Sequence, residues 1–192
     1  MPRLAVLTPF AFPSVRGNAV TVERVVAGLR DRAFEVLVRD LSAMDEAEVV
    51  ASVEQWRPEL VHAFHAFRAG PLGLRLARRL EVPLVVTLTG TDANHELFDA
   101  INAPLVRRVL EGAAAVTAFD DSIGARVTAV LPDVRPRLAT VPQAVRLAAS
   151  SRFDLDARWP LPADRVLFVL PAGIRPVKAP RRPLEPFDRV VA

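Results

Sequence analysis

Short apolar runs alternate with helix-length amphipathic segments over the first 142 residues, and this alternation limits the possible folds more than any other feature. Runs such as LAVLT at 4–8 have the length and composition of buried strands. The expected strands are 4–8, 34–40, 59–64, 83–88, 114–119 and 137–142. The expected helices are 19–32, 44–56, 70–80, 101–112 and 121–131. Apolar strands separated by helices predict an α/β fold, a doubly wound parallel sheet with helices on both faces.

The pattern changes after Pro142. Few periodic signals follow until RVLFVLPAG at 165–173, which resembles a new buried strand and precedes a short helix candidate. We therefore expect a first domain over 1–145, a linker over 146–164 and the first βα unit of an incomplete second domain over 165–192. The last segment is too short to bury a core of its own.

Composition excludes several classes of protein. The sequence has 25 basic residues, 24 of them arginine, yet its formal net charge is only +3. The pI of about 10.7 reflects the absence of tyrosine and cysteine, so it does not indicate a nucleic-acid partner. The arginines are dispersed among acidic residues, and the lysine-poor composition is typical of a GC-rich bacterial genome. No disulfide is possible, and neither a signal peptide nor an integral membrane segment is visible, which predicts a soluble, cytoplasmic protein.

The loop after the first expected strand contains a candidate anion site. Ligands of doubly wound sheets bind at the carboxyl ends of the strands, where PFAFPSVRGNAV lies. This loop lacks the glycine fingerprints of dinucleotide sites and P-loops. Gly17 and Asn18 nevertheless stand at the mouth of a helix, whose free N–H groups can receive a phosphate. The alternative is that Gly17 only makes a turn and Asn18 only caps the helix.

Three histidines raise the question of a metal site. His62 and His65 are three residues apart, which on a strand points them to opposite faces. Even with His95, the spacings of catalytic and structural zinc sites are absent, so no metal is expected. We expect one of His62 and His65 to pack in the sheet and the other to face a cleft.

The loop TLTGTDANHE at 87–96 is crowded with small and polar residues, among them Thr89, Gly90, Asp92 and His95. Polar loops on rigid sheets often carry function. An equally good alternative is an Asx-type turn, in which Asp92 or Asn94 caps the next helix.

Lys178 is the only lysine in a chain that otherwise uses arginine. It lies three residues after Arg175, just past the apolar run at 165–170. A functional cation at Lys178 is one interpretation, and a solvated surface lysine is the other.

Five stretches, taken in order, resemble a known family. They are RGNAVTVERVVAGLRDRAFEV, PELVHAFHAFRAGPLGLRLARRLEVPLVVTLTGTD, AAAVTAFDDSIGARV, LATVPQAV and VLFVLPAGIRPVKAP. Together they resemble retaining family 4 glycosyltransferases (glycosyl transferase group 1), most closely the glycosyltransferase 1 domain-containing branch. The resemblance implies the N-terminal half of a GT-B fold, in which two Rossmann-like domains face each other across a cleft. It also implies transfer of a sugar from a nucleotide-sugar donor to an acceptor with retention, without a metal or other cofactor.

The resemblance also implies roles for the basic pair and the first loop. Arg175 and Lys178 would neutralise the donor diphosphate, and Gly17 and Asn18 would lie against the donor phosphates or the acceptor.

The acceptor side departs from the family pattern. Many relatives carry a histidine at the position of Thr89, where it lines the reaction centre. We expect that role to be absent or to pass to Asp92 or His95, the catalytic candidates. His65, with Thr89 and Gly90, would line the acceptor side of the cleft.

The family's donor domain should follow Lys178, but the sequence ends at Ala192. We therefore expect this chain to lack its C-terminal domain and to be inactive alone. The alternative is a non-catalytic Rossmann-like module that binds a sugar or a nucleotide. An oxidoreductase and a Ser-His-Asp hydrolase are disfavoured, because the chain has neither G-x-G-x-x-G nor G-x-S-x-G.

Overall fold

The computed structural model describes residues 1–14, 16–144, 154–159, 166–170, 174 and 179–191. The chain divides into two units, Met1–Arg146 and Leu147–Ala192, which are described separately. The strands of the first unit are β1 (Arg3–Thr8), β2 (Glu35–Asp40), β3 (Leu60–Phe64), β4 (Leu84–Thr87), β5 (Ala115–Ala118) and β6 (Leu138–Thr140). Its α-helices are α1 (Gly17–Arg30), α2 (Glu46–Trp56), α3 (Gly70–Leu80), α4 (Ala103–Gly112) and α5 (Asp121–Val130). Two shorter helices are the π-helix η1 (Asp92–Glu96) and the 3-10 helix η2 (Pro132–Arg137).

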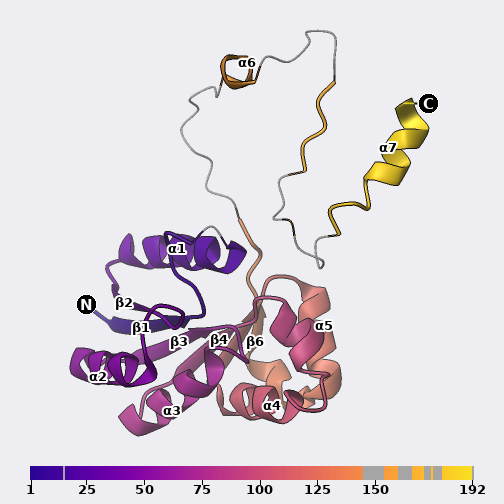
Figure 1. Cartoon of the computed structure of the whole chain (residues 1–192). Helices are drawn as coiled ribbons and strands as arrows, with labels where there is room; N and C mark the ends of the chain where they lie inside the picture. Colours follow the sequence, from indigo (N-terminus) through magenta and orange to yellow (C-terminus); the bar gives the residue numbers. More distant parts are fainter. Residues whose placement is uncertain (15, 145–153, 160–165, 171–173, 175–178, 192) are drawn as a thin grey trace. The chain divides into compact units, whose positions relative to one another are not determined.

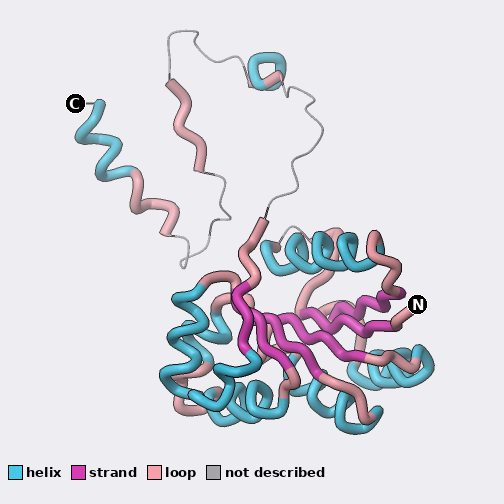
Figure 2. The backbone as a smooth tube through the Cα atoms, turned by 180° about the vertical axis from the view of Figure 1, so that it is seen from behind, coloured by secondary structure: helices cyan, strands magenta, loops and turns pink. Residues whose placement is uncertain are grey.

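The six strands form one sheet in the order β2-β1-β3-β4-β5-β6. Every neighbouring pair is parallel. Leu4 in β1 lies opposite Val36 on one side and Leu60 on the other, so β1 is held from both edges. Figure 2 shows the strands side by side, with helices on either side of them. The predicted parallel α/β sheet is therefore confirmed.

Two apolar cores flank the sheet, and they differ in size. The larger core lies between the sheet and α2 to α5, and includes Leu7, Val53, Leu76, Val106 and Val127. The smaller core contains Val6, Val36 and Phe64 of the sheet, packed with Val22 and Val26 of α1. Figure 1 shows α1 on one side of the sheet and α2 to α5 on the other. Among the described helices of this unit, α1 alone covers its face, so Thr117 is only half-buried there and Ala139 is exposed.

The start of α1 differs from the prediction. The alternative in which Asn18 caps the helix is wrong, because the N-cap residue is Arg16 and no side chain caps the first turn. The Asn18 side-chain amide instead donates to Thr8 Oγ1 at 3.3 Å, at the end of β1. The expectation was wrong because this tertiary partner competes for the amide. By contrast, α2 begins with a capping box, in which Asp45 accepts from the Glu48 N–H at 2.8 Å.

The second unit contains the helices α6 (Leu155–Arg158) and α7 (Leu184–Val191). The described part of the expected strand at 165–173, residues 166–170, is exposed and forms no strand. An isolated segment cannot become a strand without a partner for its backbone groups. Phe168 meets Phe187 of α7 edge to face, with 5.2 Å between ring centroids. Within the described residues, no helix is both long and apolar enough to span a membrane.

Candidate functional site

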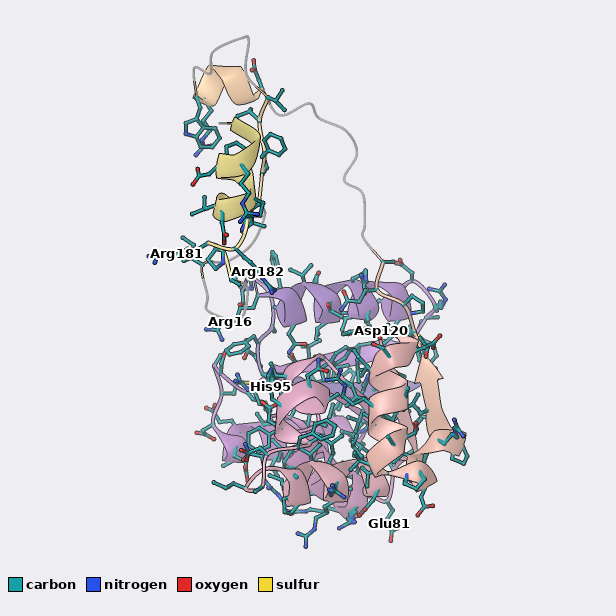
Figure 3. The ribbon with its side chains drawn as sticks, turned by 90° about the vertical axis from the view of Figure 1, so that its right-hand side faces the viewer. Arg16, Glu81, His95, Asp120, Arg181 and Arg182 are labelled. Atoms are coloured by element: carbon teal, nitrogen blue, oxygen red, sulfur yellow. The ribbon has the colours of Figure 1, made fainter. Side chains whose placement is uncertain are left out.

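The carboxyl ends of the strands form one edge of the sheet, because all six strands are parallel. The loop after β1 leads to Gly17 and Asn18, the loop after β3 holds His65, and the loop after β4 runs from Leu88 to Asp92. All lie at this same edge, with β3 between β1 and β4. Figure 3 shows Arg16 and Asp120 toward one end of the unit and Glu81 at the other. The topology thus brings together the loops that the sequence singled out.

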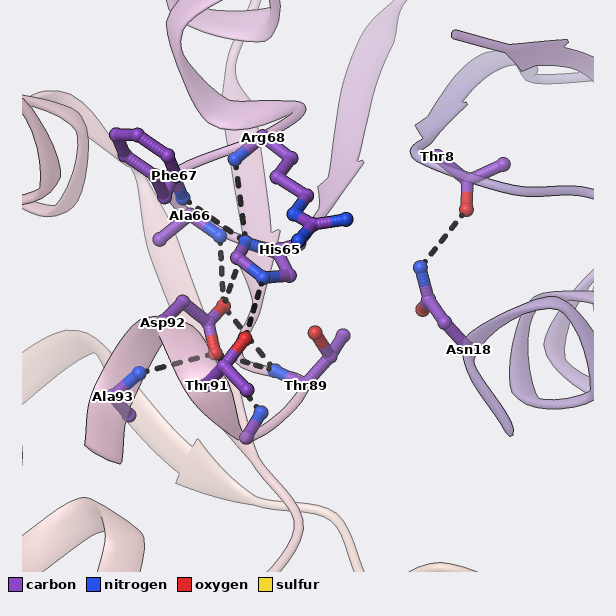
Figure 4. Close-up of polar contacts among 11 residues, drawn as sticks. Thr8, Asn18, His65, Ala66, Phe67, Arg68, Thr89, Thr91, Asp92 and Ala93 are labelled. Carbon is purple, nitrogen blue, oxygen red and sulfur yellow. Dashed lines mark hydrogen bonds and ion pairs between the residues drawn. The ribbon is translucent and has the colours of Figure 1, made fainter. Parts of the chain in front are cut away.

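His65 is the first residue of the loop after β3, and its backbone is in the left-handed region with φ of 85°. The side chain is buried. Its Nδ1 accepts from the N–H groups of Phe67 at 3.3 Å and Arg68 at 3.2 Å. An acceptor nitrogen carries no proton, so the proton of the neutral ring lies on Nε2, which is 3.0 Å from Thr91 Oγ1. The ring therefore connects the loop after β3 with the loop after β4 (Figure 4).

Asp92 forms a second connection between the same two loops. Its side chain is fully buried. Oδ2 accepts from the Ala66 N–H at 2.8 Å in the first loop. Oδ1 accepts from Gly90 at 2.9 Å and from Thr89 and Ala93, both at 3.1 Å, in its own loop. Because both oxygens of the Asp92 carboxylate accept hydrogen bonds from backbone N–H groups, Asp92 fits the interpretation of a residue that holds the turn better than that of a catalytic carboxylate.

Burial keeps His65 neutral. Burial lowers the pKa of His65, and the Arg68 guanidinium acts in the same direction. Asp92 and Glu96 oppose this lowering of the pKa, and Nδ1 lies 3.8 Å from Asp92 Oδ2. At neutral pH His65 is therefore a hydrogen-bonding connector between the loops rather than a cation.

The other predicted residues are more open. Thr89 and Gly90 are partly exposed, and His95 is exposed on η1. Gly90 has φ of 126°, which side chains with a Cβ rarely adopt, so the loop needs glycine at this position. Arg175 and Lys178 lie outside the described residues. Arg68 could not be singled out from the sequence, because it does not stand out among the 24 arginines of the chain.

A second histidine packs in the sheet, as the sequence predicted for one of the pair. His62 Nε2 is 2.7 Å from Thr87 Oγ1, which is 2.7 Å from Thr117 Oγ1 on the next strand. The ring stacks on Phe64 with 4.4 Å between centroids. Although His62 keeps a small exposed fraction, burial lowers the pKa of its ring to about 4.

The low pKa of His62 predicts a loss of stability in weak acid. In the unfolded chain His62 takes up a proton near the ordinary histidine pKa of 6.5, whereas in the folded protein it does so only near a pKa of about 4. Between these values the unfolded state binds more protons, so stability is present above pH 6.5 and falls as the pH falls. We expect the free energy of unfolding to drop by roughly 2 kcal/mol between pH 7 and pH 5. Urea unfolding at both pH values measures this, and the drop should shrink in His62→Gln. Equal drops in both proteins would contradict the assignment to His62.

Within the described residues, no group of three or more histidine, aspartate or glutamate side chains is arranged to hold a metal ion.

Comparison with known proteins gives one family and several distant structures. The family described as "Glycosyl transferase 4-like domain" matches residues 4–144. A structure entitled "S. aureus MnaA-UDP co-structure" is 14% identical with a TM-score of 0.49, over 73% of this chain and 43% of that one. The UDP-GlcNAc 2-epimerase of Methanocaldococcus jannaschii is 10% identical with a TM-score of 0.48, over 73% of this chain and 45% of that one. The chain thus spans less than half the length of these two structures.

Proposed function

Because the chain belongs to the Glycosyl transferase 4-like domain family through residues 4–144, we propose that it is the acceptor-side half of a glycosyltransferase. The reaction is transfer of a sugar from a nucleotide-sugar donor to an acceptor, with retention of configuration. The proposed architecture is the N-terminal half of a GT-B fold, in which 165–192 begins a second, donor-binding domain. The family match over the whole parallel sheet is the observation that carries the proposal.

The arrangement of the carboxyl edge supports this proposal. Two loops after neighbouring strands are fixed to each other by His65 and Asp92, and they leave Thr89 and Gly90 partly exposed. Small, partly exposed residues on a rigid loop allow close approach of a substrate hydroxyl. We assign Thr89, Gly90 and the loop of His65 to the acceptor side.

The burial of Asp92 and the exposure of His95 assign them different roles. Asp92 is a positioning residue, because its buried carboxylate holds the loop that carries Thr89. His95 remains the catalytic candidate, since it is exposed on the helix that follows this loop. It takes the role that the resemblance gives to a histidine at the position of Thr89.

The donor side consists of two separate contributions. The uncapped start of α1, at Gly17 and Asn18, offers backbone N–H groups to the donor phosphates. Arg175 and Lys178 contribute positive charge to the diphosphate, so that the leaving group needs no metal or other cofactor.

Binding of nucleotide sugars by this chain and by a longer protein with the second domain tests the proposal. We expect UDP-sugars or other nucleotide sugars to raise the Tm of the longer protein and to be consumed in the presence of an acceptor. If a panel of nucleotide sugars leaves the Tm of the longer protein unchanged, the proposed function is wrong.

Gly17 offers a way to separate binding from folding. A Cβ at Gly17 would meet no atom within 4 Å, so a larger side chain is accommodated in the fold. We expect Gly17→Leu to change the free energy of unfolding by less than about 1 kcal/mol, because leucine is also the better helix former. The side chain should nevertheless obstruct a phosphate at the helix start, and weaken binding of a nucleoside diphosphate. Calorimetric titration with UDP measures this, with Gly28→Ala in the same helix as control. Unchanged UDP affinity in Gly17→Leu would contradict a donor site at this helix.

A non-catalytic sugar- or nucleotide-binding module is the second candidate. Transfer by a longer protein would exclude it.

A further inference from the structure

Arg68 is an exposed arginine in the loop between β3 and α3 that the proposed function leaves without a role. Its backbone N–H is bonded, but within the described residues no hydrogen bond or ion pair engages its guanidinium. Some described arginines have partners, such as Arg39 with Ser52 and Arg137 with two backbone carbonyls, whereas others in the described part of the chain, such as Arg78, have none. The five N–H donors of Arg68 are therefore available to a ligand.

The backbone that carries Arg68 is fixed at every amide. The His65 N–H donates to Thr87 O at 2.9 Å, and the Ala66 N–H to Asp92 Oδ2 at 2.8 Å. Phe67 and Arg68 both donate to His65 Nδ1. Ala69 and Gly70 both donate to His65 O at 3.1 Å. A fixed backbone sets the point from which the Arg68 side chain extends, so only the side chain has to be ordered when its guanidinium binds a ligand.

The position of the guanidinium is equally informative. Figure 4 shows it beside the His65 ring, on the side of the ring where Thr8 and Asn18 lie. Because the two groups are close, the positive charge of Arg68 lowers the pKa of His65. Among the described loops that follow the carboxyl ends of strands, only two arginines occur, Arg16 and Arg68. The Arg16 guanidinium stacks over the Phe10 ring, 3.7 Å from its centroid. Arg68 is therefore the arginine without a partner in these loops, and it lies in one of the two loops that Asp92 joins.

We propose that Arg68 binds an oxyanion, a phosphate or a carboxylate, on the acceptor, and this rests on the proposed function. A guanidinium bonds two oxygens of such a group at once, which fixes orientation as well as affinity. Arg68 belongs to the loop that Asp92 joins to Thr89 and Gly90, so the anion lies on the acceptor side. The acceptor class is therefore a molecule that carries a phosphate or carboxylate group.

The experiment uses the 192-residue chain and inorganic phosphate as the probe, at constant ionic strength. Amide NMR signals of residues 65–70 should shift saturably with phosphate. In Arg68→Gln the phosphate affinity should fall about 10- to 100-fold, as expected for the loss of a charged hydrogen-bond donor. Arg78→Gln is the matched control, because Arg78 is exposed in the last turn of α3, at the opposite edge of the sheet, and should bind phosphate as the wild type does. Absence of the phosphate response, or an unchanged response in Arg68→Gln, overturns the inference.

Two further measurements separate this inference from neighbouring explanations. The pKa of His65, followed by NMR, should rise in Arg68→Gln, because the guanidinium now lowers it; an unchanged pKa means that Arg68 does not lie beside His65. A second measurement uses UDP as the donor probe, and loss of UDP binding in Arg68→Gln would assign the anion to the donor and overturn the acceptor assignment. Intact UDP binding without a phosphate response overturns the oxyanion site at Arg68 and leaves the proposed function standing. An Arg68-dependent phosphate response in a protein that binds no nucleotide sugar supports the anion site and contradicts the proposed function.

Discussion

Asp92→Asn should lower the free energy of unfolding by about 2–5 kcal/mol, because an amide cannot replace the buried carboxylate. Both carboxylate oxygens accept from backbone N–H groups, and Oδ2 alone holds the Ala66 N–H at 2.8 Å. An asparagine would set its NH₂ group against N–H donors on one side. Each buried donor left without an acceptor costs about 1–3 kcal/mol.

Thermal unfolding measures this effect, at about 2–4 °C of Tm for each kcal/mol in a chain of this length. Asp133→Asn is the matched control, since Asp133 is exposed and the same chemical change there should stay within about 0.5 kcal/mol. If Asp92→Asn has the same Tm as the wild type, Asp92 does not hold the loop, and the result supports Asp92 as a catalytic carboxylate instead.

Lys178→Ala should lower kcat/KM about 10²- to 10³-fold in a longer protein that includes the second domain. Negative charge grows on the diphosphate as the sugar leaves, and a compact ammonium group stabilises it as a point charge. Lys178 lies outside the described residues, so this prediction rests on its place in the sequence and on the resemblance. Lys178→Arg should keep part of the activity, since the charge remains.

Arg182→Ala is the control for Lys178→Ala, because Arg182 is an exposed cation four residues further along and should tolerate the change. An unchanged kcat/KM in Lys178→Ala would contradict the role at the diphosphate and support the interpretation of Lys178 as a solvated surface lysine. The 192-residue chain should transfer no sugar, and transfer by this chain alone would overturn the two-domain proposal.

The sheet could be predicted from sequence because its signal is local. Each strand is a short apolar run, and the boundaries at 83–88 and 114–119 differ from those of β4 and β5 by a single residue at each end. Neighbouring parallel strands need crossover helices, so the alternation alone implied the architecture.

The connections within the site were not predictable, because they join residues far apart in the chain. His65 accepts from its own loop only because its backbone takes a left-handed conformation, which no periodic pattern signals. Its partner Thr91 comes 26 residues later, and Asp92 accepts from the Ala66 N–H across the same separation. The alternative of an N-cap at Asn18 was wrong for the same reason, since the partner of its side chain, Thr8, lies ten positions away.

The strand order has a consequence for how the chain folds as it is synthesised. Once β1 and β2 have paired, β3, β4, β5 and β6 each add to the same growing edge in the order in which they leave the ribosome. No strand has to wait for a distant segment, so the sheet can grow one strand at a time. The vulnerable interval precedes β3, when one side of β1 has no neighbour although Ala5 and Leu7 are fully buried in the finished protein. A chaperone that binds nascent chains would find its target at that edge.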